Sequence, residues 1–209
     1  MIDLYTWSTP NGRKVSIMLE ELGVNYTVFP VDIGEGDQHK PAFLKISPNN
    51  KIPAIVDHQN GMCLMESGAI LIYLADKYNR FFADNLLERS QITEWLMWQI
   101  GGIGPTLGQV HHFKHFNPGK SHYAEERFQS EAARLYKVLD ARLVGRNFIC
   151  GTYSIADIAC WPWVSRYEWQ HIDLRHFPNV RDWYQRILER EAVQRGYYIP
   201  RKVESIPLG

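Results

Sequence analysis

The sequence predicts an α/β domain followed by an all-helical domain. In residues 1–79, short strand-like apolar runs alternate with helical runs, whereas after Leu87 the strand signals vanish and helical periodicity takes over. The length of 209 residues is sufficient for one large domain or two small ones. We therefore expect a first domain over 1–79, a linker over 80–86 and a helical domain over 87–209.

The first domain is expected to form one mixed sheet with helices packed on it. Residues 11–23 read as an amphipathic helix because Val15, Met18, Leu19 and Leu22 recur at helical spacing, with Gly23 as a stop. A short helix is expected within 40–50, ended by Ser47-Pro48, because a residue before proline avoids the helical region. The remaining elements are strands at 2–5 and 25–32, a hairpin at 52–57 and 61–66, and a helix at 66–78, giving the order βαβ-α-ββα.

The second domain is expected to be a helix bundle. Helical periodicity runs through 86–102, 122–143, 154–172 and 178–191. Ser154 and Asp157 have the spacing of a helix-capping pair, which favours a structural role for both. The tail 196–209 is expected to be irregular and partly mobile.

Composition excludes several classes of function. Lys plus Arg and Asp plus Glu each number 23, so no global positive charge would attract nucleic acid. No apolar run approaches the roughly 20 residues that span a bilayer, and the N-terminus lacks the pattern of a signal peptide, so we expect a cytoplasmic protein without membrane contact. Cys63, Cys150 and Cys160 are odd in number and without C-x-x-C spacing, which suits neither a disulfide scaffold nor a zinc site.

Residues 8–12, STPNG, stand where the first strand meets the first helix and contain no cysteine or tyrosine. Free N–H groups of the first helical turn, with the Ser8 and Thr9 hydroxyls and the Asn11 amide, would stabilise an anion such as a thiolate or carboxylate. The alternative is that Ser8 or Thr9 only caps the helix.

Two further pairs have both a structural and a functional interpretation. Ile52-Pro53 opens a strand, either as an ordinary edge proline or as a cis bond that leaves the Ile52 backbone free to pair with an extended peptide. Glu66-Ser67 precedes an apolar helix and is either a helix cap or a site for an amino-acid headgroup, with Ser67 on the carboxylate and Glu66 on the amine.

Two other patterns favour structural roles. His111 and His115 have the i, i+4 spacing of a helical metal site, but no third ligand with suitable spacing appears nearby, so we expect no metal. The glycines of GGIGPTLG, residues 101–108, lack a preceding strand and indicate close helix packing or a kink rather than a phosphate loop.

The order of elements, Ile52-Pro53 and Glu66-Ser67 together resemble the glutathione transferase family over nearly the whole chain. The resemblance implies a thioredoxin-like N-terminal domain and an all-helical C-terminal glutathione-transferase domain. The strings STPNGRKV, ISPNNKIPAIVD, ESGAILIYLA, WQIGGIGPTLGQVHHF and YSIADIACWPWV resemble in particular the bacterial Nu-class members, which are related to the yeast prion-forming nitrogen regulator.

The resemblance also implies roles for individual residues. Thr9 and Asn11 would lie beside the glutathione sulfurs as the catalytic pair, with Ser8 as an alternative to Thr9. Asn11 is thereby also a glutathione contact, and Gln38 and Lys51 would lie near the glycyl carboxylate. The Ile52 backbone would contact the cysteinyl unit, and Glu66 and Ser67 would hold the γ-glutamyl end. Arg127, from the helical domain, would reach a first or second glutathione.

Two functions follow as hypotheses. The first is a cytoplasmic glutathione-dependent disulfide reductase that uses the thiols of bound glutathione, with weak transferase or peroxidase activity, acting on small disulfides or electrophiles as a homodimer. The second is a non-catalytic glutathione-binding or regulatory protein with the same fold. The sequence does not determine whether each site holds one or two glutathione molecules.

Overall fold

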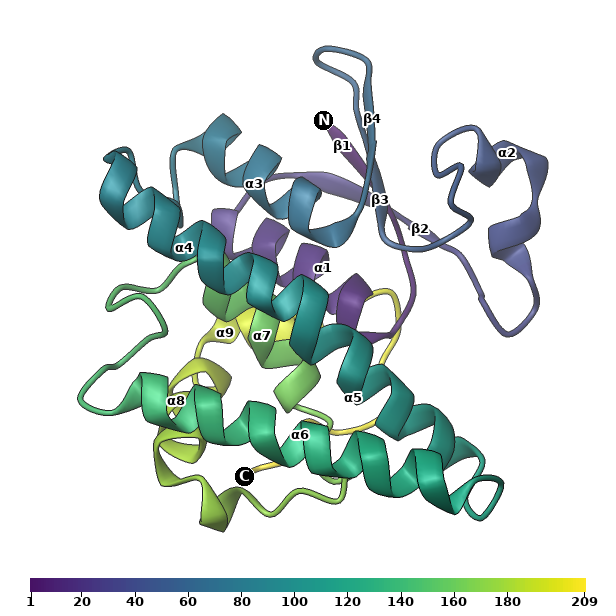
Figure 1. Ribbon diagram of the computed structural model, residues 1–209. Helices are drawn as coiled ribbons and strands as arrows, with labels where there is room; N and C mark the ends of the chain where they lie inside the picture. Colours follow the sequence, from purple (N-terminus) through teal and green to yellow (C-terminus); the bar gives the residue numbers. More distant parts are fainter. The chain divides into compact units, whose positions relative to one another are not determined.

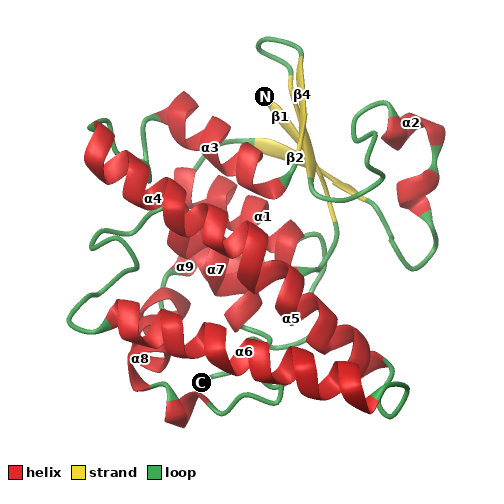
Figure 2. Cartoon of the chain, viewed as in Figure 1, coloured by secondary structure: helices red, strands yellow, loops and turns green.

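The computed structural model describes residues 1–209, which divide into two compact units. The first unit contains Met1–Phe82 together with Glu189–Ile206, and the second contains Ala83–Leu188 together with Pro207–Gly209. The return of the C-terminal segment to the first unit differs from the sequence-based boundary, which assigned all of 87–209 to the helical domain. The predicted fold class, a thioredoxin-like sheet domain and an all-helical domain, is confirmed (Figures 1 and 2).

The first unit is built on a four-stranded mixed sheet with the order β2-β1-β3-β4. The strands are β1 (Ile2–Thr6), β2 (Tyr26–Pro30), β3 (Ala54–Asp57) and β4 (Met62–Met65). β1 pairs with β2 in parallel, while the β1–β3 and β3–β4 pairs are antiparallel. A parallel pair needs a crossover connection, which the first helix supplies.

Helix α1 (Pro10–Leu22) is the crossover and is more buried than an ordinary amphipathic helix. Every residue from Gly12 to Leu19 is buried, including the charged Arg13 and Lys14. The reason is α9 (Glu191–Tyr197), a helix that the sequence analysis did not predict. α9 packs so closely that a Cβ atom on Gly196 would lie 2.6 Å from the Cα atom of Ile17.

Helix α3 (Ser67–Tyr78) packs against α1 and against β3 and β4. The other connection, from β2 to β3, holds only one turn of 3-10 helix (Asp37–His39) and the short α2 (Pro41–Leu44). Phe43 of α2 joins a small cluster with Val31 and Ala54, against which Tyr5 packs. Because successive strand residues point to opposite faces, Leu4 faces the main core while Tyr5 faces this cluster.

The second unit is a helix bundle. Its main helices are α4 (Leu86–Trp98), α5 (Gly104–Val110), α6 (His122–Leu143), α7 (Ile155–Val164) and α8 (Pro178–Leu188), with π-helical turns at Gln99–Ile103 and His111–Phe116 and a 3-10 turn at Leu174–His176. Among the glycines of residues 101–108, Gly104 is the one that serves close packing, because a Cβ atom there would lie 2.9 Å from Nε2 of Gln99. The π-turns join α4 to α5 and extend α5 without a loop.

The predicted capping pair at the start of α7 is confirmed as a full capping box. Asp157 is completely buried and accepts hydrogen bonds from the backbone N–H and hydroxyl of Ser154 at 3.0 and 3.2 Å. It also accepts from Ile149 N–H and Trp183 Nε1, each at 2.9 Å. The carboxylate therefore joins the helix start, the preceding loop and α8 in one buried network.

The C-terminal tail is irregular from Tyr198 onward, as expected, and its residues up to Ile206 belong to the first unit. Glu204 accepts hydrogen bonds from Arg13 at 3.2 Å and from the Tyr197 hydroxyl at 3.1 Å. The guanidinium of Arg201 lies over the Trp7 ring, 4.4 Å from its centroid. These contacts tie the tail to the β1–α1 junction.

Candidate functional site

A small pocket in the first unit brings together five of the residues expected to bind glutathione. Its lining contains Asn11 from α1, Lys51 and Ile52 from the segment before β3, and Glu66 and Ser67 from the start of α3. The remaining lining residues are Ser47, Asn49, Pro53 and Met65. The pocket volume is about 60 Å³, which is too small to enclose a tripeptide. A ligand of that size would therefore lie across the mouth of the pocket.

Ser8 and Thr9, the two hydroxyl residues at the β1–α1 junction, have different hydrogen-bond partners. Thr9 is the N-cap of α1, and its Oγ1 accepts a hydrogen bond from Gly12 N–H at 3.3 Å. The Thr9 hydroxyl hydrogen has no acceptor within the chain, so it is available to a ligand. Ser8 is buried and donates its hydroxyl hydrogen to the carbonyl of Arg201 at 3.0 Å. Of the two, Thr9 therefore has the free donor.

Gly12 permits the close approach of helix and loop at this junction. A Cβ atom at this position would lie 2.2 Å from the carbonyl oxygen of Trp7 and 2.5 Å from Oγ1 of Thr6. Because the first of these atoms belongs to the backbone, no side-chain rotation would relieve the clash. Glycine is therefore required for the N-terminus of α1 to sit directly on the end of β1.

The pocket carries unpaired charges of both signs. The Lys51 ammonium and the Glu66 carboxylate are both exposed and form no ion pair or side-chain hydrogen bond within the chain. Glu66 also adopts a positive φ of 68°, a conformation that costs a non-glycine residue about 1–3 kcal/mol. Such a cost is typical of positions where a side chain or backbone group must be held for a ligand. A zwitterionic ligand would complement this arrangement of charges.

The backbone groups at the pocket are also available. The Ile52-Pro53 bond is cis, as one of the two interpretations expected, and the N–H and C=O of Ile52 form no hydrogen bond within the chain. α3 starts at Ser67 without a side-chain cap and without an acidic residue in its first turn. Its first N–H groups are therefore free to bind an anion, which supports the functional interpretation of the Glu66-Ser67 pair.

Gln38 and Arg127 do not line this pocket. Gln38 belongs to the 3-10 turn Asp37–His39; its Nε2 donates to the Ile33 carbonyl at 3.4 Å, and its buried Oε1 has no hydrogen-bond partner. A sequence-based role on the glycyl carboxylate therefore stays a prediction for Gln38.

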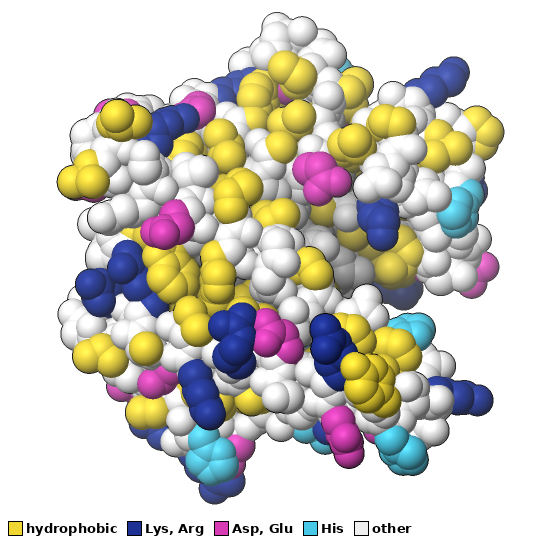
Figure 3. All heavy atoms as spheres, in the orientation of Figure 1, with side chains coloured by type: hydrophobic (Ala, Val, Ile, Leu, Met, Phe, Trp, Pro, Cys, Tyr) yellow, Lys and Arg dark blue, Asp and Glu magenta, His cyan; other side chains and the backbone are white.

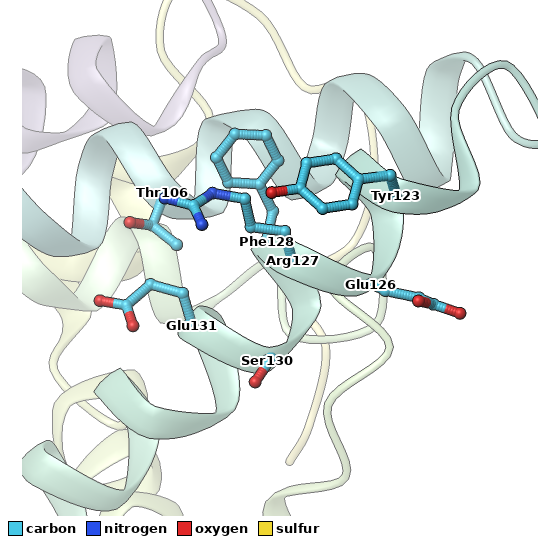
Figure 4. A pocket seen from close by; sticks show the side chains of 7 residues that line it. All are labelled: Thr106, Tyr123, Glu126, Arg127, Phe128, Ser130 and Glu131. Carbon is cyan, nitrogen blue, oxygen red and sulfur yellow. The ribbon is translucent and has the colours of Figure 1, made fainter.

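Arg127 lies on α6 in the second unit, where it lines a pocket of about 670 Å³. The pocket lining comprises Thr106, Tyr123, Glu126, Arg127, Phe128, Ser130 and Glu131. Figure 4 shows Tyr123 and Arg127, one helical turn apart, directed to the same side of α6, with Glu126 directed away from them. The exposed Arg127 guanidinium has no hydrogen-bond partner in the chain, so it is free for an anion.

Three contributors to the site were missed by the sequence analysis. Ser47 is fully buried and donates to the Lys51 carbonyl at 2.8 Å, which holds the segment before β3. Asn49 lines the pocket beside it. Lys14 is buried behind the pocket and donates from Nζ to Ser67 Oγ at 3.1 Å. The Ser47-Pro48 turn offered a signal for the first two, but nothing local distinguished Lys14 from a surface lysine.

The other sequence candidates have structural surroundings. His111 is buried, and its Nε2 lies 3.1 Å from Nε2 of Gln170. An amide nitrogen only donates, so the imidazole nitrogen is the acceptor, and the second amide hydrogen goes to the Trp163 carbonyl at 2.7 Å. Burial lowers the pKa of His111 to about 3, aided by Arg166. None of the three cysteines lines the pocket of the first unit. Cys63 is exposed, Cys160 is buried, and burial raises the pKa of Cys150 to about 11.

Charges of both signs are mixed on the surface of the chain. Lys and Arg side chains lie among Asp and Glu side chains on the face drawn in Figure 3, in keeping with the equal totals of 23. None of the helices combines the length and apolar character that crossing a bilayer would require.

The sheet order and the cis proline before β3 define a thioredoxin-like first domain, and helices α4 to α8 make the second domain all-helical. Residues 1–76 match the model of the glutathione S-transferase N-terminal domain, and residues 123–186 match that of the C-terminal domain. The chain belongs to the glutathione transferase family.

Individual relatives are similar over nearly their full length. The disulfide-bond oxidoreductase YfcG of Escherichia coli is 52% identical over 198 residues, which cover 92% of each chain. A glutathione transferase of Burkholderia graminis, crystallised with two glutathione molecules per subunit, has a TM-score of 0.90 and 42% identity, covering 95% of this chain and 88% of that one. A glutathione transferase of Pseudomonas putida with one glutathione disulfide per subunit has a TM-score of 0.90 and 44% identity, covering 95% and 91%.

Proposed function

We propose that this protein is a glutathione-dependent disulfide-bond reductase that uses the thiols of bound glutathione and no cysteine of its own. The observation that carries the proposal is the pocket of the first unit, which gathers Asn11, Lys51, Ile52, Glu66 and Ser67 but no cysteine. The similarity to a disulfide-bond oxidoreductase and to proteins holding two glutathiones or one glutathione disulfide supports it. Weak transferase or peroxidase activity would use the same thiolate.

Each part of glutathione would have its own partners in the pocket. Glu66 would accept from the γ-glutamyl amine, and Ser67 with the first N–H groups of α3 would donate to the neighbouring carboxylate. The free N–H and C=O of Ile52 would pair with the cysteinyl unit as an added strand does. Lys51, with Gln38, would hold the glycyl carboxylate.

Thr9 and Asn11 would place donors at the sulfur. A thiol of pKa about 8.5 is only a few per cent ionised at neutral pH, and each unit of pKa corresponds to about 1.4 kcal/mol. A hydrogen bond to a charged group contributes roughly 1.5–3 kcal/mol. One or two donors from the Thr9 hydroxyl, the Asn11 amide and the start of α1 would therefore lower the thiol pKa by one to a few units before the cost of desolvation.

The reaction balances with two glutathiones per disulfide. A first glutathione thiolate attacks one sulfur of the substrate disulfide, the S–S bond breaks, and the leaving thiolate takes up a proton. A second glutathione thiolate then attacks the glutathione sulfur of the mixed disulfide and releases the second substrate thiol. The two electrons come from the two glutathiones, which leave as glutathione disulfide. The protein supplies alignment and a polar setting for the thiolate.

The proposed function also includes a role for Arg127 and a dimeric state. Arg127 would bind a carboxylate of glutathione, and the second glutathione molecule of the site is the one we assign to it. The protein would act as a homodimer in the cytoplasm, where thiols are kept reduced. Size-exclusion chromatography with light scattering checks the dimer.

Replacement of all three cysteines tests the central claim. The variant Cys63→Ser, Cys150→Ser, Cys160→Ala should reduce a small disulfide such as hydroxyethyl disulfide with glutathione at a rate close to that of the parent protein. Circular dichroism establishes that the variant is folded. A folded variant without activity would show that a protein thiol takes part.

Calorimetry separates the enzyme from a protein that only binds glutathione. Glutathione and glutathione disulfide are titrated into the protein, and disulfide turnover is measured on the same sample. Binding with turnover above the rate of free glutathione supports the reductase. Binding without turnover supports the regulatory alternative, and absence of binding rejects both.

A further inference from the structure

Lys14 is a fully buried lysine next to the proposed glutathione pocket. Its side chain is 1% exposed, and its Nζ donates a hydrogen bond to Ser67 Oγ at 3.1 Å. Lys14 lies three residues after Asn11 on α1, so the two side chains leave the helix on the same face. Asn11 lines the pocket, whereas Lys14 stands behind Ser67 and away from the surface.

The hydrogen bond determines how Ser67 can act. A lysine ammonium is only a donor, so it occupies a lone pair of the Ser67 oxygen. The Ser67 hydroxyl hydrogen has no acceptor within the chain and is left to donate to a ligand. Lys14 thus orients Ser67 as a donor toward the pocket instead of an acceptor.

Charge acts in the same direction. Ser67 is the first residue of the 12-residue helix α3, whose N-terminus carries partial positive charge and has neither an acidic residue in its first turn nor a side-chain cap. An ammonium 3.1 Å from Ser67 Oγ adds a formal positive charge at the same place. The buried ammonium therefore adds to the partial positive charge at the N-terminus of α3.

We propose that Lys14 is a positioning residue for the carboxylate at the γ-glutamyl end of glutathione. It directs the Ser67 hydroxyl toward that carboxylate and places a buried positive charge behind it. The proposal rests on the proposed function, because it takes glutathione as the ligand with its γ-glutamyl end at Glu66 and Ser67. Lys14 does not line the pocket, yet it would favour ligands that carry this carboxylate.

The test compares two ligands on Lys14→Met, which keeps the length of the side chain and removes the charge. The ligands are glutathione and 4-aminobutyryl-Cys-Gly, which lacks only the α-carboxylate of the γ-glutamyl unit. We expect the Kd of glutathione to rise about tenfold or more, and that of the analogue to change less than about twofold. The KM for glutathione should rise in parallel, with kcat nearly unchanged, because Lys14 acts at the end of the ligand remote from sulfur.

Two further variants sharpen the comparison. Lys14→Gln keeps a donor for Ser67 without the charge and should give an intermediate Kd. Lys45→Met removes an exposed lysine outside the pocket lining and should leave both Kd values unchanged, which controls for net charge.

The outcomes decide the proposal separately from the function. An unchanged Kd for glutathione in Lys14→Met, or an equal change in Kd for both ligands, overturns the role of Lys14. Disulfide turnover by the parent protein would still support the reductase function in that case. If neither Lys14 variant folds, the lysine is structural and the proposal is wrong. A parent protein that does not bind glutathione refutes the proposed function itself.

Discussion

The hydroxyl of Ser8 donates a hydrogen bond to the carbonyl of Arg201, 193 residues further along the chain, at 3.0 Å. This bond ties the β1–α1 junction to the C-terminal tail. It also uses the hydroxyl hydrogen that Ser8 would otherwise donate to a sulfur. The neighbouring Thr9 keeps its hydroxyl hydrogen free while its oxygen caps α1. The two hydroxyls at the start of the site therefore differ in what they can do.

Ser8→Ala should affect stability more than catalysis. Loss of its hydrogen bond should lower the free energy of unfolding by about 1 kcal/mol and leave kcat/KM for disulfide reduction nearly unchanged. Thr9→Val should lower kcat/KM strongly, and Thr9→Ser, which retains the hydroxyl, should restore most of it. Denaturant unfolding and steady-state kinetics on the three variants check this, and a larger catalytic loss for Ser8→Ala than for Thr9→Val would assign the sulfur contact to Ser8.

Asn11→Ala should raise the pH at which the rate of disulfide reduction levels off. An amide donor stabilises the charged thiolate, so its removal raises the pKa of the bound thiol, by about one unit for about 1.4 kcal/mol. The pH–rate profile at saturating glutathione measures this shift. Asn11→Asp, similar in shape but negatively charged, should raise the apparent pKa further; identical profiles for all three proteins would remove Asn11 from the sulfur site.

Arg127→Met should weaken one glutathione-binding event and spare the other. A hydrogen-bonded guanidinium–carboxylate contact contributes roughly 1.5–3 kcal/mol, so the affected Kd should rise about tenfold or more. Calorimetric titration resolves the number of glutathiones per subunit and the two affinities. Lys137→Met removes an exposed charge from the same helix and serves as the control. Equal affinities in Arg127→Met and the parent would refute a role for Arg127 in binding.

Asp157 should make folding stability depend on pH. Burial raises its pKa to about 6, although donors from Ile149, Trp183 and Ser154 offset part of the effect. A carboxyl with a folded-state pKa above its unfolded value of about 3.9 stabilises the fold when protonated, and this contribution is lost as pH rises from about 4 to about 6. The shift of about two units corresponds to about 3 kcal/mol.

Asp157→Asn provides the measurement, because the amide does not titrate. The difference in free energy of unfolding between the parent and the variant should be largest near pH 4 and decrease toward pH 7. Urea unfolding at several pH values gives this difference. A difference that increases with pH would mean that the four hydrogen bonds stabilise the carboxylate more than burial disfavours it.

Local patterns predicted much of the fold. The periodicity of Val15, Met18, Leu19 and Leu22 predicted α1, and Gly23 ends it in a left-handed conformation with φ of 68°. The spacing of Ser154 and Asp157 predicted the capping box of α7. These features depend on contacts within a few residues, so a short stretch of sequence contains the information for them.

Other features were missed because they depend on distant segments. Helix α9 is seven residues long, too short for a periodic pattern, and it exists by packing Gly196 onto Ile17 of α1. The same packing buries Arg13, whose guanidinium lies 3.5 Å from the centroid of the Tyr197 ring. A charged residue in a helix pattern ordinarily indicates a solvated face, and here the returning chain covered that face.

The sequence alone determined the order of the elements in residues 1–78, a possible cap at Ser8 or Thr9, the cis-compatible Ile52-Pro53 and the resemblance that joined Asn11 to Glu66-Ser67. Only the tertiary structure decided that Ser8 is held by Arg201 and that Lys14 is buried against Ser67. The physical reason is that helical and turn preferences act over a few residues. The direction of a hydroxyl and the burial of a charge are set instead by atoms that folding brings together from far apart in the chain.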